Sequence, residues 1–165
     1  MPLVARPRMT PTAPLWNPLD TNRLSSWGMN PDDTLYEAER SVSMMRYPTR
    51  FPDGESAAAF FEKVIGTQWF ANRWPAVIKR NLVVKQSNHQ NAYADFGNNT
   101  IYLPPWSLTD FTLLHEVAHF CAARERKEMH GPMFRAAHHA LIGRFMSTEA
   151  ARCYRYACLA HNLEF

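Results

Sequence analysis

The sequence lacks several features that would assign a protein class at once. None of its apolar runs approaches the roughly 18 residues that cross a membrane. Its start carries arginines but no continuous apolar stretch of the secretory kind. These absences predict a cytoplasmic protein with no membrane partner. The three cysteines, Cys121, Cys153 and Cys158, are too few for a disulfide framework or a paired set of zinc ligands.

The charge of the chain does not indicate a particular kind of partner. Its net charge is +3, from 18 Lys and Arg against 15 Asp and Glu, and no dense cationic stripe is present. Nucleic acid is therefore only weakly supported as a partner. Trp69, Phe70 and Trp74 would suit a base-stacking surface, but their helical spacing favours a place in the core.

Two regions of the chain differ in composition. Residues 1–31 hold six of the 12 prolines and little periodic apolar pattern, which predicts an extended N-terminal arm. Trp16 and Trp27 in this arm suit docking, either onto the protein's own domain or onto a partner. Residues 32–165 are long enough for one compact domain, and the chain is 46 % hydrophobic, enough for a core.

Apolar periodicity over residues 32–165 predicts an α+β domain. Five helices are expected. The first covers 32–47, the second begins near Ser56 and the third runs from Ser107 to about Arg126. The last two begin at Gly131-Pro132 and at Ser147 or Thr148. Three short strands are expected at 81–86, 92–96 and 100–103, the last two joined by a tight turn at 97–99. The predicted fold is a small three-stranded sheet, antiparallel or mixed, packed against an active-site helix and further helices.

The clearest chemistry lies in the sequence His-Glu-Val-Ala-His at residues 115–119. Two imidazoles four residues apart on a helix lie on one face, so His115 and His119 can bind one metal ion. Glu116 is then within reach of a water on that metal, where it can act as general base. His130, eleven residues further on, is the expected third ligand, and three ligands leave one position open. Zn²⁺ is the predicted cofactor.

Other ligand sets fit the spacing less well. The metzincin pattern needs a histidine at position 125, which is a glutamate. A glutamate on a following helix is the other common third ligand. Glu125 and Glu128 are too close to the motif for this role and lie in a charged run, and Glu149 is a weaker candidate than His130. Cys121 points away from the ligand face and is interpreted as a buried small residue.

Two further expectations concern the surroundings of the site. His138 or His139 could reach it to steady an oxyanion, but surface or capping roles are favoured for both. A peptide substrate needs an edge strand on which to pair. Residues 100–103, directly before the active-site helix, are the candidate strand, although they could equally form an interior strand.

The motifs LLHEVAHF and HGPMF together resemble those of the SprT-like zinc metalloproteases. The likeness extends to a family of small metallohydrolases from actinobacteria and their phages, through residues 35–39, the hairpin 92–104 and residues 146–150. It covers residues 33–158. The resemblance implies a zincin-like α+β core, zinc on His115, His119 and His130, and Glu116 as catalytic acid/base. Unlike SprT-like proteases that act on DNA-bound proteins, this chain has no cysteine-rich zinc ribbon.

We therefore expect a zinc-dependent metallopeptidase that acts on a protein or peptide, in the host cytoplasm or the virion if it is phage-encoded. The alternative is a structural or interaction protein, for example of a phage particle, that retains a zincin fold, with or without the metal. In that case the N-terminal arm would dock onto a partner.

Overall fold

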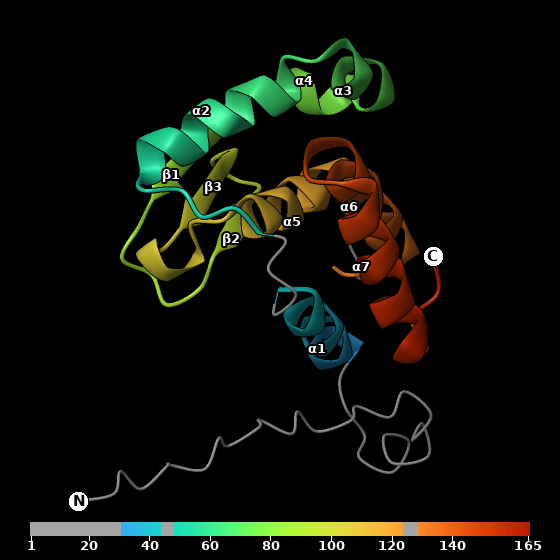
Figure 1. The fold of residues 1–165 in the computed structure, drawn as a ribbon. Helices are drawn as coiled ribbons and strands as arrows, with labels where there is room; N and C mark the ends of the chain where they lie inside the picture. Colours follow the sequence, from blue (N-terminus) through green and yellow to red (C-terminus); the bar gives the residue numbers. More distant parts are fainter. Residues whose placement is uncertain (1–30, 44–47, 124–128) are drawn as a thin grey trace, which may run out of the picture.

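A computed structural model describes residues 31–43, 48–123 and 129–165 of the chain, and Figure 1 shows their arrangement. These residues form seven α-helices, one 3₁₀ turn and three strands. In chain order they are α1 (Pro31–Ser43), α2 (Gly54–Ile65), α3 (Gln68–Arg73), α4 (Pro75–Ile78), β1 (Val83–Gln86), β2 (Tyr93–Asp95), β3 (Thr100–Leu103), η2 (Pro105–Ser107), α5 (Asp110–Cys121), α6 (Pro132–Phe145) and α7 (Thr148–Ala160). The predicted α+β class is confirmed, whereas most of the expected arm and the charged run 124–128 lie outside the described residues.

The sheet is mixed, with the strand order β1-β3-β2. Strand β2 pairs antiparallel with β3 and β1 pairs parallel with it. The hairpin turn is fixed by Asp95, whose carboxylate accepts hydrogen bonds from the backbone N–H groups of Gly97 and Asn98. Because β3 is the central strand, residues 100–103 have no free edge for a substrate, so of the two alternatives the interior strand is the correct one. The edge nearest the site belongs to β2.

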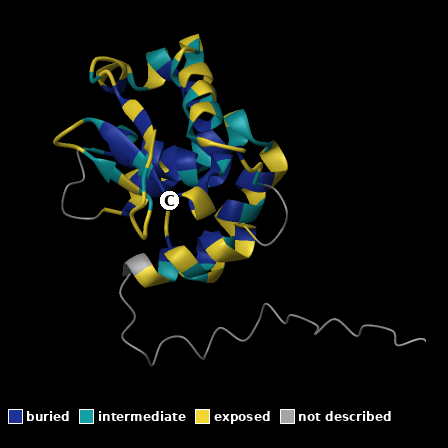
Figure 2. Ribbon diagram, turned by 90° about the vertical axis from the view of Figure 1, so that its left-hand side faces the viewer, coloured by how far each residue is buried: buried dark blue, intermediate teal, exposed yellow. Residues whose placement is uncertain are grey.

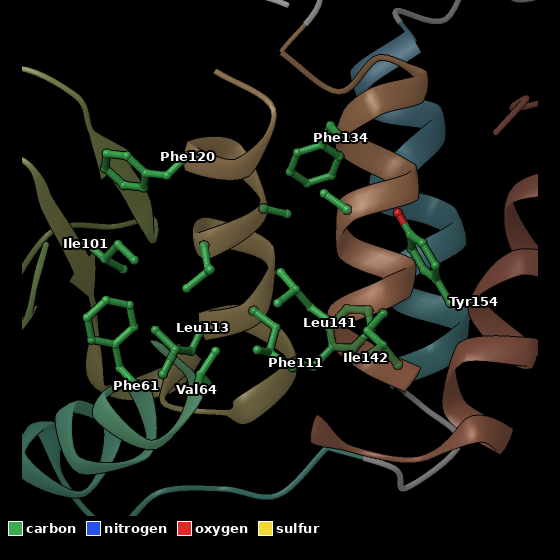
Figure 3. Packing of buried hydrophobic residues seen from close by; sticks show 14 of the residues in the cluster. Phe61, Val64, Ile101, Phe111, Leu113, Phe120, Phe134, Leu141, Ile142 and Tyr154 are labelled. Atoms are coloured by element: carbon green, nitrogen blue, oxygen red, sulfur yellow. The ribbon is translucent and has the colours of Figure 1, made fainter. Parts of the chain in front are cut away.

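Helix α5 forms the centre of the molecule. It contacts α6 on one side and β2, β3 and α2 on the other. In Figure 3, Phe61 and Ile101 lie on one side of this helix and Phe134 and Leu141 on the other. Nearly all residues from Asp110 to Phe120 are buried, and Figure 2 shows this buried centre in dark blue. A helix buried all round is a rigid support for side chains that must converge on one point.

The start of α5 differs from the expectation. Pro104 and Pro105 begin a separate 3₁₀ turn, so the helix starts at Asp110 rather than Ser107, and Thr109 provides its cap. The Asp110 carboxylate accepts a hydrogen bond of 2.8 Å from the Thr49 backbone N–H. This contact ties residues 48–51 to the start of the helix. Gly131-Pro132 and Ser147 begin α6 and α7 as predicted.

Helix α1 packs against α7 and lies below α5 in Figure 1. Its buried side chains are Leu35, Ala38, Glu39 and Val42. Trp69 and Phe70 pack in the core, as expected from their spacing. No helix within the described ranges is both long and apolar enough to cross a membrane.

Candidate metal centre

The three predicted ligands lie together at the end of α5. His115 and His119 are one turn apart on this helix, and His130 lies two residues before α6. All three side chains are buried, and one donor nitrogen of each lies within 4.8 Å of the other two. One helix and the connection that precedes α6 thus bring together a compact group of imidazoles that could hold a metal ion.

The spacing of two donors fits one tetrahedral ion. The Nε2 atoms of His115 and His130 are 3.3 Å apart. Two nitrogens bonded to zinc at 2.0–2.1 Å with a tetrahedral angle would be about 3.3–3.4 Å apart. The residues present therefore fit the metal that the motif implies.

Phe134 explains why the histidine before α6 reaches the histidines of α5. Its buried ring lies 4.8 Å from the ring of His115, 4.6 Å from that of His119 and 4.8 Å from that of His130, centroid to centroid. Arg135 adds a second constraint, because its guanidinium donates to the backbone carbonyl of His130 and to that of Glu164. The start of α6 thus supplies both a packing surface for the ligands and a fixed position for His130.

Glu39 of α1 belongs to the site, a role that was not predicted from the sequence. The His115 Nδ1 atom lies 2.8 Å from its Oε1 atom, across 76 residues of sequence. The His138 Nδ1 atom lies 3.1 Å from the same oxygen, although this contact is not aligned as a hydrogen bond. The sequence does contain an indication of this role. Glu39 lies on the same helical face as the apolar residues Leu35 and Val42, and a carboxylate on a buried face needs a partner.

The surface role expected for His138 is therefore wrong. Its side chain is fully buried, because it lies one turn beyond Phe134 on the inner face of α6. It contacts Glu39 rather than the open side of the site, so it has no position from which to steady an oxyanion. His139 is half-buried and packs on Phe165.

Burial and charge set the protonation of the site. Burial disfavours a charged His115, but the charge and hydrogen bond of Glu39 outweigh it and raise the pKa of His115 to about 9. Burial also acts on His119, and with the neighbouring His115 and His130 it lowers the pKa to about 2. His119 is therefore neutral, as a metal ligand must be. In Glu39, His115 and His138 overcome the effect of burial and hold the carboxyl pKa well below its usual range.

Glu116 differs from Glu39 in its protonation. Burial raises the pKa of Glu116 to about 7, with His115 opposing the shift and Glu39 adding to it. A carboxyl group whose pKa lies near neutrality can both accept and return a proton. Glu116 is therefore suited to acid–base chemistry beside the histidine cluster.

An open trough of about 600 Å³ leads to His115 and Glu116. Helix α1 lines one wall with Tyr36 and Arg40, and the start of β2 lines the other with Tyr93. Trp106 also lines the trough. It is 61 % exposed, yet its indole N–H donates to the Gln90 carbonyl at 3.0 Å. The trough thus has an aromatic surface on the side chains that line it together with His115.

The chain matches no protein-family model, no curated protein and no solved structure. Support for a metal centre therefore comes from the arrangement of its own residues. Two weaker candidates are also placed by the structure. Glu149 is exposed and pairs with Arg152 at 2.9 Å, away from the histidines. Cys121 is half-buried, and burial raises the pKa of its thiol well above the usual value.

Proposed function

We propose that this protein is a zinc-dependent metallopeptidase with a zincin-like core, related to the SprT-like group. The observation that carries the proposal is the convergence of three buried imidazoles beside a buried glutamate, with His115 and Glu116 lining an open trough. Three histidine ligands are a common set for catalytic zinc and leave one coordination position open. Imidazole also binds copper, iron and nickel, so the identity of the metal is part of the proposal.

Metal binding and proton transfer would be carried out by different residues of the site. His115, His119 and His130 would hold the metal, which when bound supplies a nucleophile at neutral pH and polarises the carbonyl under attack. Glu116 would accept a proton on its carboxylate and return it to the leaving amine. Its raised pKa supports this role because both protonation states are then accessible near pH 7.

The trough supports a peptide as the substrate. Strand β2 has no strand partner among the described residues on the side away from β3, and its first residue, Tyr93, lines the trough. An extended peptide could add to such an edge through backbone hydrogen bonds. Trp106 and Tyr93 would then offer aromatic surface to its side chains, and the scissile bond would lie over Glu116.

The test is to measure bound zinc and casein cleavage for the wild type, Glu116→Gln and His130→Ala. Glu116→Gln should keep about one zinc per chain and lose cleavage, because it removes the base and leaves the ligands. His130→Ala should lose both. Glu62→Gln, at an exposed site on α2, is a matched control and should behave as wild type.

Two results would contradict the proposal. Cleavage retained by Glu116→Gln would remove the assigned base. Zinc in the wild type and in Glu116→Gln, with no hydrolysis of any offered substrate by either, would favour a structural or interaction protein that keeps the metal.

A further inference from the structure

Two groups of three buried side chains share His115. One consists of His115, His119 and His130, and the other of Glu39, His115 and His138. Each group could in principle hold a cation, so the geometry must decide what the second group does.

The shortest distance in the second group is that of a hydrogen bond. His115 Nδ1 and Glu39 Oε1 are 2.8 Å apart, within the range of about 2.7–2.9 Å for a charge-assisted N–H···O contact. Two donors on one tetrahedral zinc would be about 3.3–3.4 Å apart, as the Nε2 atoms of His115 and His130 are. A proton therefore fits between Glu39 and His115 better than a metal does.

This hydrogen bond has a consequence for the first group. As a carboxylate Glu39 can only accept in this contact, so the proton between the two groups is on His115 Nδ1. The lone pair of a neutral His115 is then on Nε2, the atom that faces His130. A histidine that donates one ring N–H to a carboxylate is fixed in tautomer and ring orientation and becomes a stronger ligand.

His138 lies beside the same carboxylate. Its fully buried ring packs against Phe111 at 4.9 Å and Tyr154 at 4.8 Å, centroid to centroid. From there its Nδ1 atom lies 3.1 Å from the Glu39 oxygen that contacts His115. Glu39 thus lies between two imidazoles, on a helix whose other buried side chains are apolar.

We propose that Glu39 is the positioning residue of the metal centre, through the hydrogen bond that orients His115 Nε2 toward the metal. The inference rests on the metal site of the proposed function and is independent of hydrolysis. It makes α1, which is remote in sequence, a functional part of the site. A purely structural role is the competing explanation, in which Glu39 only anchors α1.

The test is the rate at which the zinc-loaded full-length protein loses zinc to an excess of chelator. This dissociation rate starts from the zinc-bound protein. Protons that compete with zinc for His115 in the metal-free protein therefore do not affect it. Glu39→Ala should lose zinc roughly 10–100-fold faster, the range by which such outer partners change metal affinity. Glu39→Gln should fall between this variant and the wild type, because an amide oxygen still accepts the His115 N–H. Glu37→Gln, which removes a neighbouring carboxylate on α1, should have no effect.

An unchanged rate in a folded Glu39→Ala protein would overturn the proposal, and so would two zinc ions per wild-type chain, which would place a metal in the second group. If Glu39→Ala does not fold, nitrogen NMR of zinc-loaded wild type still decides. A proton on His115 Nδ1 and zinc on Nε2 are expected, and zinc on Nδ1 would overturn the inference. A wild type that binds no zinc would refute the metal centre itself. Normal zinc binding without peptidase activity would count only against the proposed function.

Discussion

Zinc binding by this protein should release about one proton from His115. With a pKa of about 9, His115 holds its proton almost completely at pH 7 in the metal-free protein. A histidine with the ordinary pKa near 6.5 would be only about one quarter protonated at that pH. A ligand nitrogen must give up its proton to the solvent before it binds the metal. The raised pKa of His115 therefore becomes a measurable proton count.

The comparison with Glu39→Gln isolates this proton. Without the Glu39 charge, burial is the main influence left on His115 and lowers its pKa, so this histidine is neutral at pH 7. Titration calorimetry with zinc at pH 7, in two buffers that differ in ionisation enthalpy, gives the protons released on binding. The wild type should release roughly one proton more than Glu39→Gln.

The pH dependence has a defined sign. Because the pKa of His115 is raised in the folded protein, the proton is held below about pH 9 and lost above it. The apparent zinc affinity of the wild type should therefore rise from pH 7 to pH 9 and then level off, and that of Glu39→Gln should rise less. Equal proton release by the two proteins, with Glu37→Gln as the control, would refute this account of His115.

Two further predictions follow from the packing and the trough. Phe134→Ala should lower the free energy of unfolding by about 3–5 kcal/mol and weaken zinc binding, measured by urea unfolding and chelator competition. Trp106→Ala, which removes an exposed ring and one hydrogen bond, should cost only about 1 kcal/mol, and equal losses would contradict the packing assigned to Phe134. Because Arg40 lines the trough, peptides with an acidic residue near the scissile bond should be cleaved roughly two- to fivefold better than basic ones. Arg40→Glu should invert that preference, and an unchanged ratio would exclude Arg40 from substrate contact.

The parts of this molecule that depend on local sequence could be predicted. The spacing of His115 and His119 places them on one helical face, and Gly131-Pro132 begins the helix that follows His130. The turn at 97–99 is likewise local, because Asp95 and the residues after it form its hydrogen bonds.

The contacts that join distant segments could not be predicted. Strand β1 pairs in parallel with β3 rather than extending the hairpin at β2, and no local signal distinguishes these two edges. Glu39 reaches His115 across 76 residues, and only the packing of α1 brings them together. His138 and His139 are adjacent in sequence and of the same residue type. Which of them is buried depends on the face of α6 that packs against the rest of the protein.

The central claim is that three histidines of this chain bind one metal ion, and X-ray absorption at the zinc edge tests it most directly. Zinc-loaded full-length protein should show an inner shell of nitrogen and oxygen only, at about 2.0–2.1 Å, with the outer scattering of about three imidazoles. His130→Ala should lose that signal or lower its imidazole count. A sulfur shell near 2.3 Å, which would assign the metal to cysteines, or a wild-type protein that retains no zinc, would contradict the account.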